Sequence, residues 1–197
     1  MFFSIRYFLL VLWCLATGAG FVAIERYAHT PAQLNHQIDR WPASSHLQTA
    51  HGKPTLVMFA HPHCPCTRAS MNELSRILSQ CEGQVTASVV FLEFESIDKP
   101  VKQSGLWRQA MAIPHLHVAV DHQQIISRLF QARSSGETFL FQANGNLSYH
   151  GGITLSRGHE GDNTGHDAIV SILTKGTSHR SMGPVYGCSL SSPRTEE

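Results

Sequence analysis

The sequence predicts an α/β protein with a mixed central sheet, preceded by a transmembrane helix. Three observations support this prediction. Residues 7–24 form an N-terminal run without a charged side chain. Between residues 53 and 175, short β-rich apolar runs alternate with segments of helical periodicity. Within that stretch, Asn144-Gly145 joins two further β-rich runs, and this dipeptide is typical of a two-residue hairpin turn.

Length and composition limit the classes of protein to consider. The 197 residues suffice for one ordinary domain and an appendage. Lys and Arg number 15 against 14 acidic residues, with no basic block, which argues against a nucleic-acid partner. The 42% hydrophobic content is typical of a folded chain. Thirteen His and five Cys direct attention to thiol or metal chemistry.

Residues 1–27 are expected to form an uncleaved signal-anchor. The apolar run is longer than the roughly 7–15 residues of a cleavable signal peptide, and it can cross a bilayer core of about 30 Å. Cleavage near the small residues 17–20 stays open, as does a cytoplasm-facing anchor. Cys14 lies inside this run as an apolar filler. We expect a single-pass membrane protein whose domain faces the periplasm or another extracytoplasmic space.

The first half of the domain is expected to be strand, helix and strand. Residues 28–52 form a linker with room for one short helix. A buried strand follows at 55–60, where the sequence is TLVMFA, and an amphipathic helix at 67–80 has its apolar side chains at three- and four-residue spacing. A second buried strand is expected at 85–94.

The second half contains an inserted helix, strand and helix, and then a hairpin and a closing helix. The inserted strand is expected at 117–120 and the helix after it around 125–130. The hairpin covers 138–150, and Asp162 or Asn163 caps the closing helix. Residues 176–197 form a Gly-, Ser- and Pro-rich tail. The domain itself is expected to span residues 53–175.

Cys64 is the expected chemical centre. It stands in the run His61-Pro-His-Cys-Pro-Cys-Thr-Arg68, where the first strand ends and the first helix begins. The free N–H groups and dipole of a helix N-terminus stabilise a thiolate, so the pKa of Cys64 should be lowered and its nucleophilicity raised. The alternative is an inert buried cysteine.

The segment LVMFAHPHCPCTRASMNEL resembles the strand, W-C-x-x-C-R motif and helix of the thioredoxin superfamily. The segment VAVDHQQIISRLFQARSSGETFLFQANGNLSYHGG resembles the inserted strand and helix and the hairpin of its membrane-anchored, exported members. The resemblance covers Lys53 to Lys175. More narrowly, HPHCPCTR, GGITLSRGHEGDN and GPVYGCSL are similar to RedB-like proteins. This resemblance implies a thioredoxin-like fold and a thiol-disulfide oxidoreductase.

Two departures from the family pattern matter. If Cys64 matches the first family cysteine and Arg68 the residue after the second, Thr67 occupies the resolving position and the second thiol has moved to Cys66. Gly136 stands where the family has a cis-proline beside the cysteines, a residue that helps to hold extended substrates and keeps metals away. The absence of this proline weakens the prediction of an oxidoreductase and favours the alternative of a metal site.

The loop 151–163 is expected to line the site, because the last hairpin strand of the family ends at the same edge of the sheet as the active-site turn. Arg157 and His159 are therefore candidates to orient or protonate a substrate. Cys188 is a further candidate to resolve Cys64. A mobile tail and a structural bridge from Cys188 to Cys81 are the competing possibilities.

The sequence thus predicts a thiol-disulfide oxidoreductase without a cofactor, acting on a protein or small-molecule thiol or disulfide. The expected catalytic residues are Cys64, Cys66, Thr67, Arg68 and Cys188, and the expected substrate contacts are His63, Gly136, Arg157 and His159. One alternative is a copper- or zinc-binding protein that uses His61, His63, Cys64, Cys66 and His159. A degenerate redoxin that acts only as a binding module is another.

Overall fold

The computed structural model describes residues 2–34, 38–93 and 100–190 and forms two compact units, which divide after Thr30. The first unit is helix α1 (Phe2–His29). Its segment Ile5–His29 is long and apolar enough to cross a membrane, a property that a signal sequence shares. The expected apolar N-terminal helix is therefore present.

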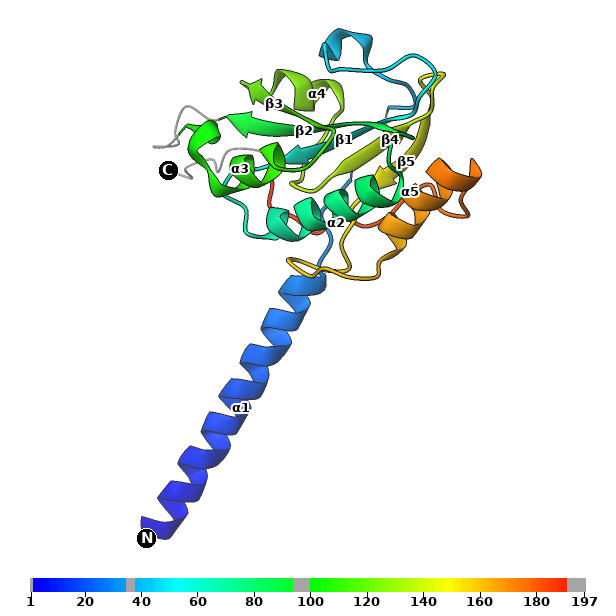
Figure 1. Cartoon of the computed structure of the whole chain (residues 1–197). Helices are drawn as coiled ribbons and strands as arrows, with labels where there is room; N and C mark the ends of the chain where they lie inside the picture. The colour runs from blue at the N-terminus through cyan, green and yellow to red at the C-terminus, as the bar shows by residue number, and fades with distance from the viewer. Residues whose placement is uncertain (1, 35–37, 94–99, 191–197) are drawn as a thin grey trace. The chain divides into compact units, whose positions relative to one another are not determined.

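The second unit is built on a five-stranded mixed sheet with strand order β3-β2-β1-β4-β5 (Figure 1). Strands β1, β2 and β3 are parallel, whereas β4 is antiparallel to both of its neighbours. The strands are β1 (Thr55–Ala60), β2 (Thr86–Glu93), β3 (Leu116–His122), β4 (Thr138–Phe141) and β5 (Leu147–Gly151). The mixed sheet and the hairpin are both confirmed. The connection is longer than the two-residue turn expected from Asn144-Gly145, because the N–H of Gln142 donates to the carbonyl of Asn146 and the N–H of Gly145 donates to the carbonyl of Gln142, both at 2.8 Å.

Helices cover both faces of this sheet. One face packs against α2 (Cys66–Gln80), α3 (Gly105–Met111) and α5 (Thr164–Lys175). The other face is covered by α4 (Ile125–Leu129) and by apolar side chains of the segment 38–47. Two short 3-10 helices complete the structure, η1 (Ala43–Ser45) and η2 (Val101–Gln103).

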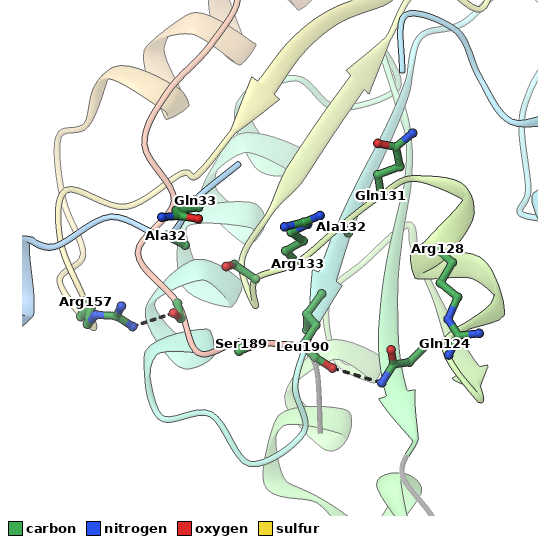
Figure 2. Close-up of a pocket in the computed structure, with 12 residues that line it drawn as sticks. Ala32, Gln33, Gln124, Arg128, Gln131, Ala132, Arg133, Arg157, Ser189 and Leu190 are labelled. Carbon is green, nitrogen blue, oxygen red and sulfur yellow. Dashed lines mark hydrogen bonds between the residues drawn. The ribbon is translucent and has the colours of Figure 1, made fainter. Parts of the chain in front are cut away.

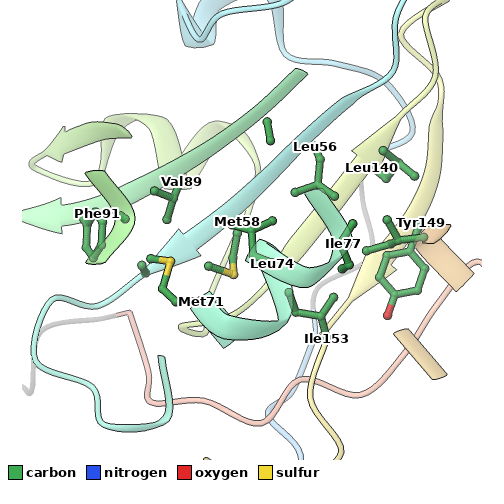
Figure 3. Packing of buried hydrophobic residues seen from close by; sticks show 14 of the residues in the cluster. Leu56, Met58, Met71, Leu74, Ile77, Val89, Phe91, Leu140, Tyr149 and Ile153 are labelled. Atoms are coloured by element: carbon green, nitrogen blue, oxygen red, sulfur yellow. The ribbon is translucent and has the colours of Figure 1, made fainter. Parts of the chain in front are cut away.

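The core follows from the two-residue period of the strands, which sends successive side chains to opposite faces. In β1, Leu56 and Met58 belong to the cluster beneath α2, shown in Figure 3, whereas Val57 and Phe59 belong to the cluster beneath α4. All six residues of β1 are buried, as expected for a central strand with both faces covered. This rigid strand carries the turn that holds Cys64.

The closing helix, α5, begins after one of the two predicted N-cap residues. Asn163 precedes α5, and its side-chain oxygen accepts a hydrogen bond from the backbone N–H of His166 at 2.8 Å. Asn163 is therefore the N-cap, and Asp162 is not. Gly176 ends the helix with a positive φ of 78°, a conformation that glycine adopts without strain.

Candidate active site

The turn between β1 and α2 is built by short backbone hydrogen bonds. The N–H of Cys64 donates to the carbonyl of His61 at 3.2 Å, and the N–H of Thr67 donates to the carbonyl of Cys64 at 3.1 Å. Pro65 is the N-cap residue, and α2 begins at Cys66. The turn therefore places both cysteines at the amino end of α2, the end that favours a negative charge.

Three thiols meet at this turn. The Sγ atoms of Cys64 and Cys188 lie 2.6 Å apart although 124 positions separate the residues in the chain, and the sulfurs of Cys64, Cys66 and Cys188 all lie within 4.8 Å of one another. Cys64 is 2% exposed, whereas Cys66 and Cys188 are half-buried. The structure thus brings together all three cysteines that the sequence marked as candidates.

Cys81 is remote from this cluster. It is the C-cap residue of the 15-residue helix α2, about 22 Å along the helix axis from Cys66 at 1.5 Å per residue. Because Cys188 lies against Cys64, the possible structural bridge from Cys188 to Cys81 is wrong. Cys81 is instead a buried core residue.

An extended tail segment holds Cys188 in place. The N–H of Ser135 donates to the carbonyl of Cys188, and the N–H of Leu190 donates to the carbonyl of Arg133, both at 2.8 Å. Gly187 packs so closely that a Cβ there would overlap the carbonyl oxygen of Ser135. With Leu190 only 2% exposed, the chain around Cys188 is fixed on both sides. A mobile tail is therefore wrong for this segment.

A buried glutamate, Glu137, shapes the loop that receives the tail. One carboxylate oxygen of Glu137 accepts hydrogen bonds from the N–H groups of Arg133 and Ser134 at 2.7 and 3.0 Å. The other oxygen lies 2.7 Å from Nε2 of His150, and neither side chain is more than 1% exposed. A buried carboxylate needs such hydrogen-bond partners. Glu137 therefore holds the loop in the backbone conformation to which the tail is hydrogen bonded.

Ser135 connects this loop to the cysteine turn. Its hydroxyl oxygen accepts a hydrogen bond from the N–H of His61 at 2.8 Å and shares a second one, of 2.6 Å, with the hydroxyl of buried Thr67. The sequence did not single out Ser135, so this role was missed. The one sequence signal for Ser135 is its position directly before Gly136, which was a candidate site residue.

The surroundings shift the pKa values of the three thiols in different directions. Burial alone would raise the pKa of Cys64, but hydrogen bonds from Cys188 and Thr67 outweigh it, so the pKa of Cys64 is lowered. Burial and the neighbouring Cys64 raise the pKa of Cys66, against an opposing effect of Arg157. Burial, together with Cys64, raises the pKa of Cys188 to about 12. Cys64 is thus the first of the three to become a thiolate.

The loop 151–163 brings Arg157 to the thiols. The Arg157 guanidinium donates a 2.6 Å hydrogen bond to the carbonyl of Gly187 and also interacts with the thiol of Cys66. Glu73, fully buried on α2, holds the loop by accepting a 2.8 Å hydrogen bond from the N–H of Gly161. His159 is exposed, and its ring is hydrogen bonded to Ser156 within the same loop.

The remaining candidate residues differ in burial and in their hydrogen bonds. Gly136 has a φ of 85°, and its N–H donates to the carbonyl of Phe59 at 2.8 Å. His63 and Arg68 are exposed. The Nδ1 atom of His61 accepts a hydrogen bond from the N–H of His63 at 3.2 Å. In the described part of the chain, the group able to share one metal ion contains the three cysteines and no histidine.

Comparisons with known proteins match the fold. No family model and no curated protein matches this chain. An uncharacterized conserved protein from Geobacillus kaustophilus is 18% identical, with 73% of this chain and 79% of that chain covered and a TM-score of 0.60. A hypothetical protein from Sinorhizobium meliloti is 19% identical, with coverages of 70% and 79% and a TM-score of 0.59.

A solution structure of a thioredoxin-like protein in its oxidized form matches more loosely. It is 14% identical and has a TM-score of 0.49, with 78% of this chain and 99% of that chain covered. These likenesses concern the fold alone. The mixed sheet of β1 to β5, the inserted α3-β3-α4 and the closing hairpin and helix give this chain a thioredoxin-like fold.

Proposed function

We propose that this protein is a membrane-anchored thiol-disulfide oxidoreductase whose redox pair is Cys64 and Cys188. The observation that supports this most directly is the 2.6 Å separation of the two sulfurs, held by a tail that is bonded on both sides of Cys188. The anchor is α1, and the domain is proposed to face an extracytoplasmic space, where disulfides persist. The narrower assignment to the RedB-like proteins, which the sequence resembles, is part of this proposal.

The two sulfurs have different roles in the proposed exchange. In the oxidised protein, a substrate thiolate attacks the half-buried sulfur of Cys188, because Cys64 is almost inaccessible. The Cys64–Cys188 bond breaks, and Cys64 leaves as a thiolate. A thiolate that is stabilised by its surroundings is the better leaving group. When Cys188 is held in the mixed disulfide, the hydrogen bond from Thr67 and the amino end of α2 still stabilise the Cys64 thiolate. A second substrate thiolate then attacks the substrate sulfur of the mixed disulfide, which releases Cys188 and the oxidised substrate.

The neighbouring residues assist this exchange through position and charge. Thr67 stabilises the thiolate of Cys64 by a hydrogen bond, and Arg157 offers positive charge beside Cys66 and Cys188. Stabilising the Cys64 thiolate stabilises the reduced protein, and this makes the pair a better oxidant. The protein is therefore proposed to donate disulfides to thiol substrates.

A redox titration of the full-length protein in detergent tests the pairing. The native protein and the variants Cys188→Ser and Cys66→Ser are equilibrated with reduced and oxidised glutathione, and free thiols are counted. We expect a two-electron couple that is lost in Cys188→Ser and kept in Cys66→Ser. The reverse pattern would contradict the proposed pair, and the absence of any couple in the native protein would contradict the oxidoreductase.

A second candidate function is binding of a soft metal ion, which the clustering of three sulfurs within 4.8 Å favours. Thiolates are ligands that suit Cu(I) and Zn²⁺. This site differs from the histidine-containing set expected from the sequence, since Cys188 provides the third ligand. Stoichiometric copper or zinc in purified reduced protein, lost in Cys188→Ser, would support it. A metal-free protein with three titratable site thiols would argue against it.

A further inference from the structure

A cavity with three arginines adjoins the tail segment that carries Cys188. It has a volume of about 770 Å³ and is shown in Figure 2. Gly187 and Ser189, the two neighbours of Cys188, belong to its wall, together with Leu190. This volume lies within the range of roughly 300–1,000 Å³ that is usual for small-molecule sites.

The charged residues that line this cavity are all positive. Arg128, Arg133 and Arg157 contribute to it, and no acidic residue does. Arg128 and Arg133 are exposed, and no carboxylate among the described residues forms an ion pair with either of them. Arginine is suited to bind carboxylates, because its planar guanidinium can donate two parallel hydrogen bonds.

Two buried carboxylates on adjoining segments, Glu137 and Asp121, do not pair with Arg128 or Arg133. Glu137 is bonded to two backbone N–H groups and to His150. Asp121 accepts hydrogen bonds from the N–H groups of Ile126 and Ser127 at the start of α4, at 2.7 and 2.8 Å. Both side chains are fully buried and their oxygens are already used. Arg128 and Arg133 therefore stay available to a ligand.

Arg157 connects the cavity to the thiols. Its guanidinium lines the cavity, donates to the carbonyl of Gly187 and interacts with the thiol of Cys66. Figure 2 shows Arg157 and Arg128 on opposite sides of Ser189 and Leu190. A ligand bound here would therefore have Arg128 at one end and Arg157 at the other. None of the three cysteines lines the cavity itself, so the thiol of the ligand reaches the sulfur cluster past Arg157.

The tail also limits the size of the ligand. The N–H of Ser135 and the carbonyl of Arg133 are already bonded to the tail at Cys188 and Leu190. An extended polypeptide cannot pair with these backbone groups while the tail is docked. The cavity beside them remains open to a small molecule.

We infer that this cavity binds a small thiol or disulfide that carries carboxylates, with Arg128 and Arg133 as the carboxylate partners and Arg157 beside the reacting sulfur. This inference rests on the proposed function and names its substrate class. Two molecules of the thiol reduce the Cys64–Cys188 disulfide. The first forms a mixed disulfide with Cys188 and releases Cys64, and the second leaves with the first as the oxidised dimer. The protein gains the two electrons that the two thiols lose.

The test compares glutathione with glutathione diethyl ester, which has a similar thiol but no free carboxylate. Oxidised full-length protein in neutral detergent is mixed with each thiol, and the rate constant per thiolate is measured. We expect glutathione to react roughly tenfold faster than its diethyl ester, because two partly exposed ion pairs together contribute about that factor to binding. This preference should fall to about one in the double variant Arg128→Gln/Arg133→Gln and decrease with added salt.

Arg108→Gln is the matched control, since Arg108 is an exposed arginine on α3 that does not line the cavity. It should keep the full preference. Equal rates for the two thiols in the native protein would overturn the inference, as would a preference that survives in the double variant. Reduction by neutral 2-mercaptoethanol is measured in parallel. If it proceeds while the charge preference is absent, the substrate class is wrong and the oxidoreductase stands.

Binding without chemistry separates the two proposals further. S-methylglutathione has the same carboxylates but no free thiol, and its binding is followed by ligand-observed NMR. We expect binding to the native protein and to Arg108→Gln, and none to the double variant. Binding in a protein that no thiol reduces would place the failure in the proposed redox function. Absence of binding to the native protein would overturn the site.

Discussion

Leu190 is predicted to set how strongly Cys188 is coupled to Cys64. Its side chain is 2% exposed and packs with Val57, Phe59 and the phenylalanines beneath α4. Truncation of a buried leucine to alanine costs about 2–5 kcal/mol. Because Leu190 lies two residues after Cys188, this loss acts on docking of the tail. Leu190→Ala should therefore weaken the Cys64–Cys188 disulfide.

The expected size follows from the lower end of that range. A loss of about 2 kcal/mol in tail docking lowers the effective concentration of Cys188 at Cys64 roughly 30-fold. For a two-electron couple this raises the reduction potential by about 40 mV, because the disulfide becomes easier to reduce. The assay is equilibration of full-length native and variant protein with glutathione buffers, followed by thiol counting.

Leu129→Ala is the control for general destabilisation. Leu129 is partly buried on α4 and packs against the same cluster, but it lies outside the tail. It should lower the free energy of unfolding and leave the reduction potential within about 10 mV of native. A Leu190→Ala protein that is destabilised but keeps the native reduction potential would contradict this role of Leu190. In that case the tail would not depend on this anchor.

Three further predictions concern single sites. Gly136→Ala should destabilise the fold by at least about 1 kcal/mol in urea unfolding, because Gly136 has a φ of 85° and a Cβ would lie 2.7 Å from Oγ of Ser70; a native midpoint would contradict this. Arg157→Gln should raise the pKa of Cys66 further and slow its alkylation at pH 8, and an unchanged rate would argue against their interaction. Asn163→Ala should cost about 1 kcal/mol in urea unfolding by removing the N-cap of α5, with no effect on thiol counts.

Much of the fold could be predicted from local sequence. The apolar run 55–60 became β1, and the three- and four-residue spacing after Cys66 became α2. Asn144-Gly145 lies in the hairpin connection between β4 and β5, although this connection is longer than the expected two-residue turn. These features depend on side-chain period and turn chemistry, and both can be recognised within about ten residues.

The arrangement of the site depends on contacts between distant segments. Cys188 reaches Cys64 because Gly187 permits a close approach to Ser135 and because Leu190 is buried in a core built from other elements. Spacing in the sequence allowed this return but could not select it over a bridge to Cys81. Arg157 was predicted, but the other two cavity arginines were missed for the same reason. Arg128 and Arg133 resemble ordinary exposed charges until the tail is placed beside them.

The pairing of Cys64 with Cys188 is tested most directly by mapping the disulfide by mass spectrometry in mildly oxidised full-length protein. The proteolytic peptide that contains Cys188 should be linked to the peptide that contains Cys64, and the same link should form in Cys66→Ser. Cys81 should remain a free thiol. A Cys64–Cys66 disulfide with Cys188 left free would contradict the claim that Cys64 and Cys188 form the redox pair.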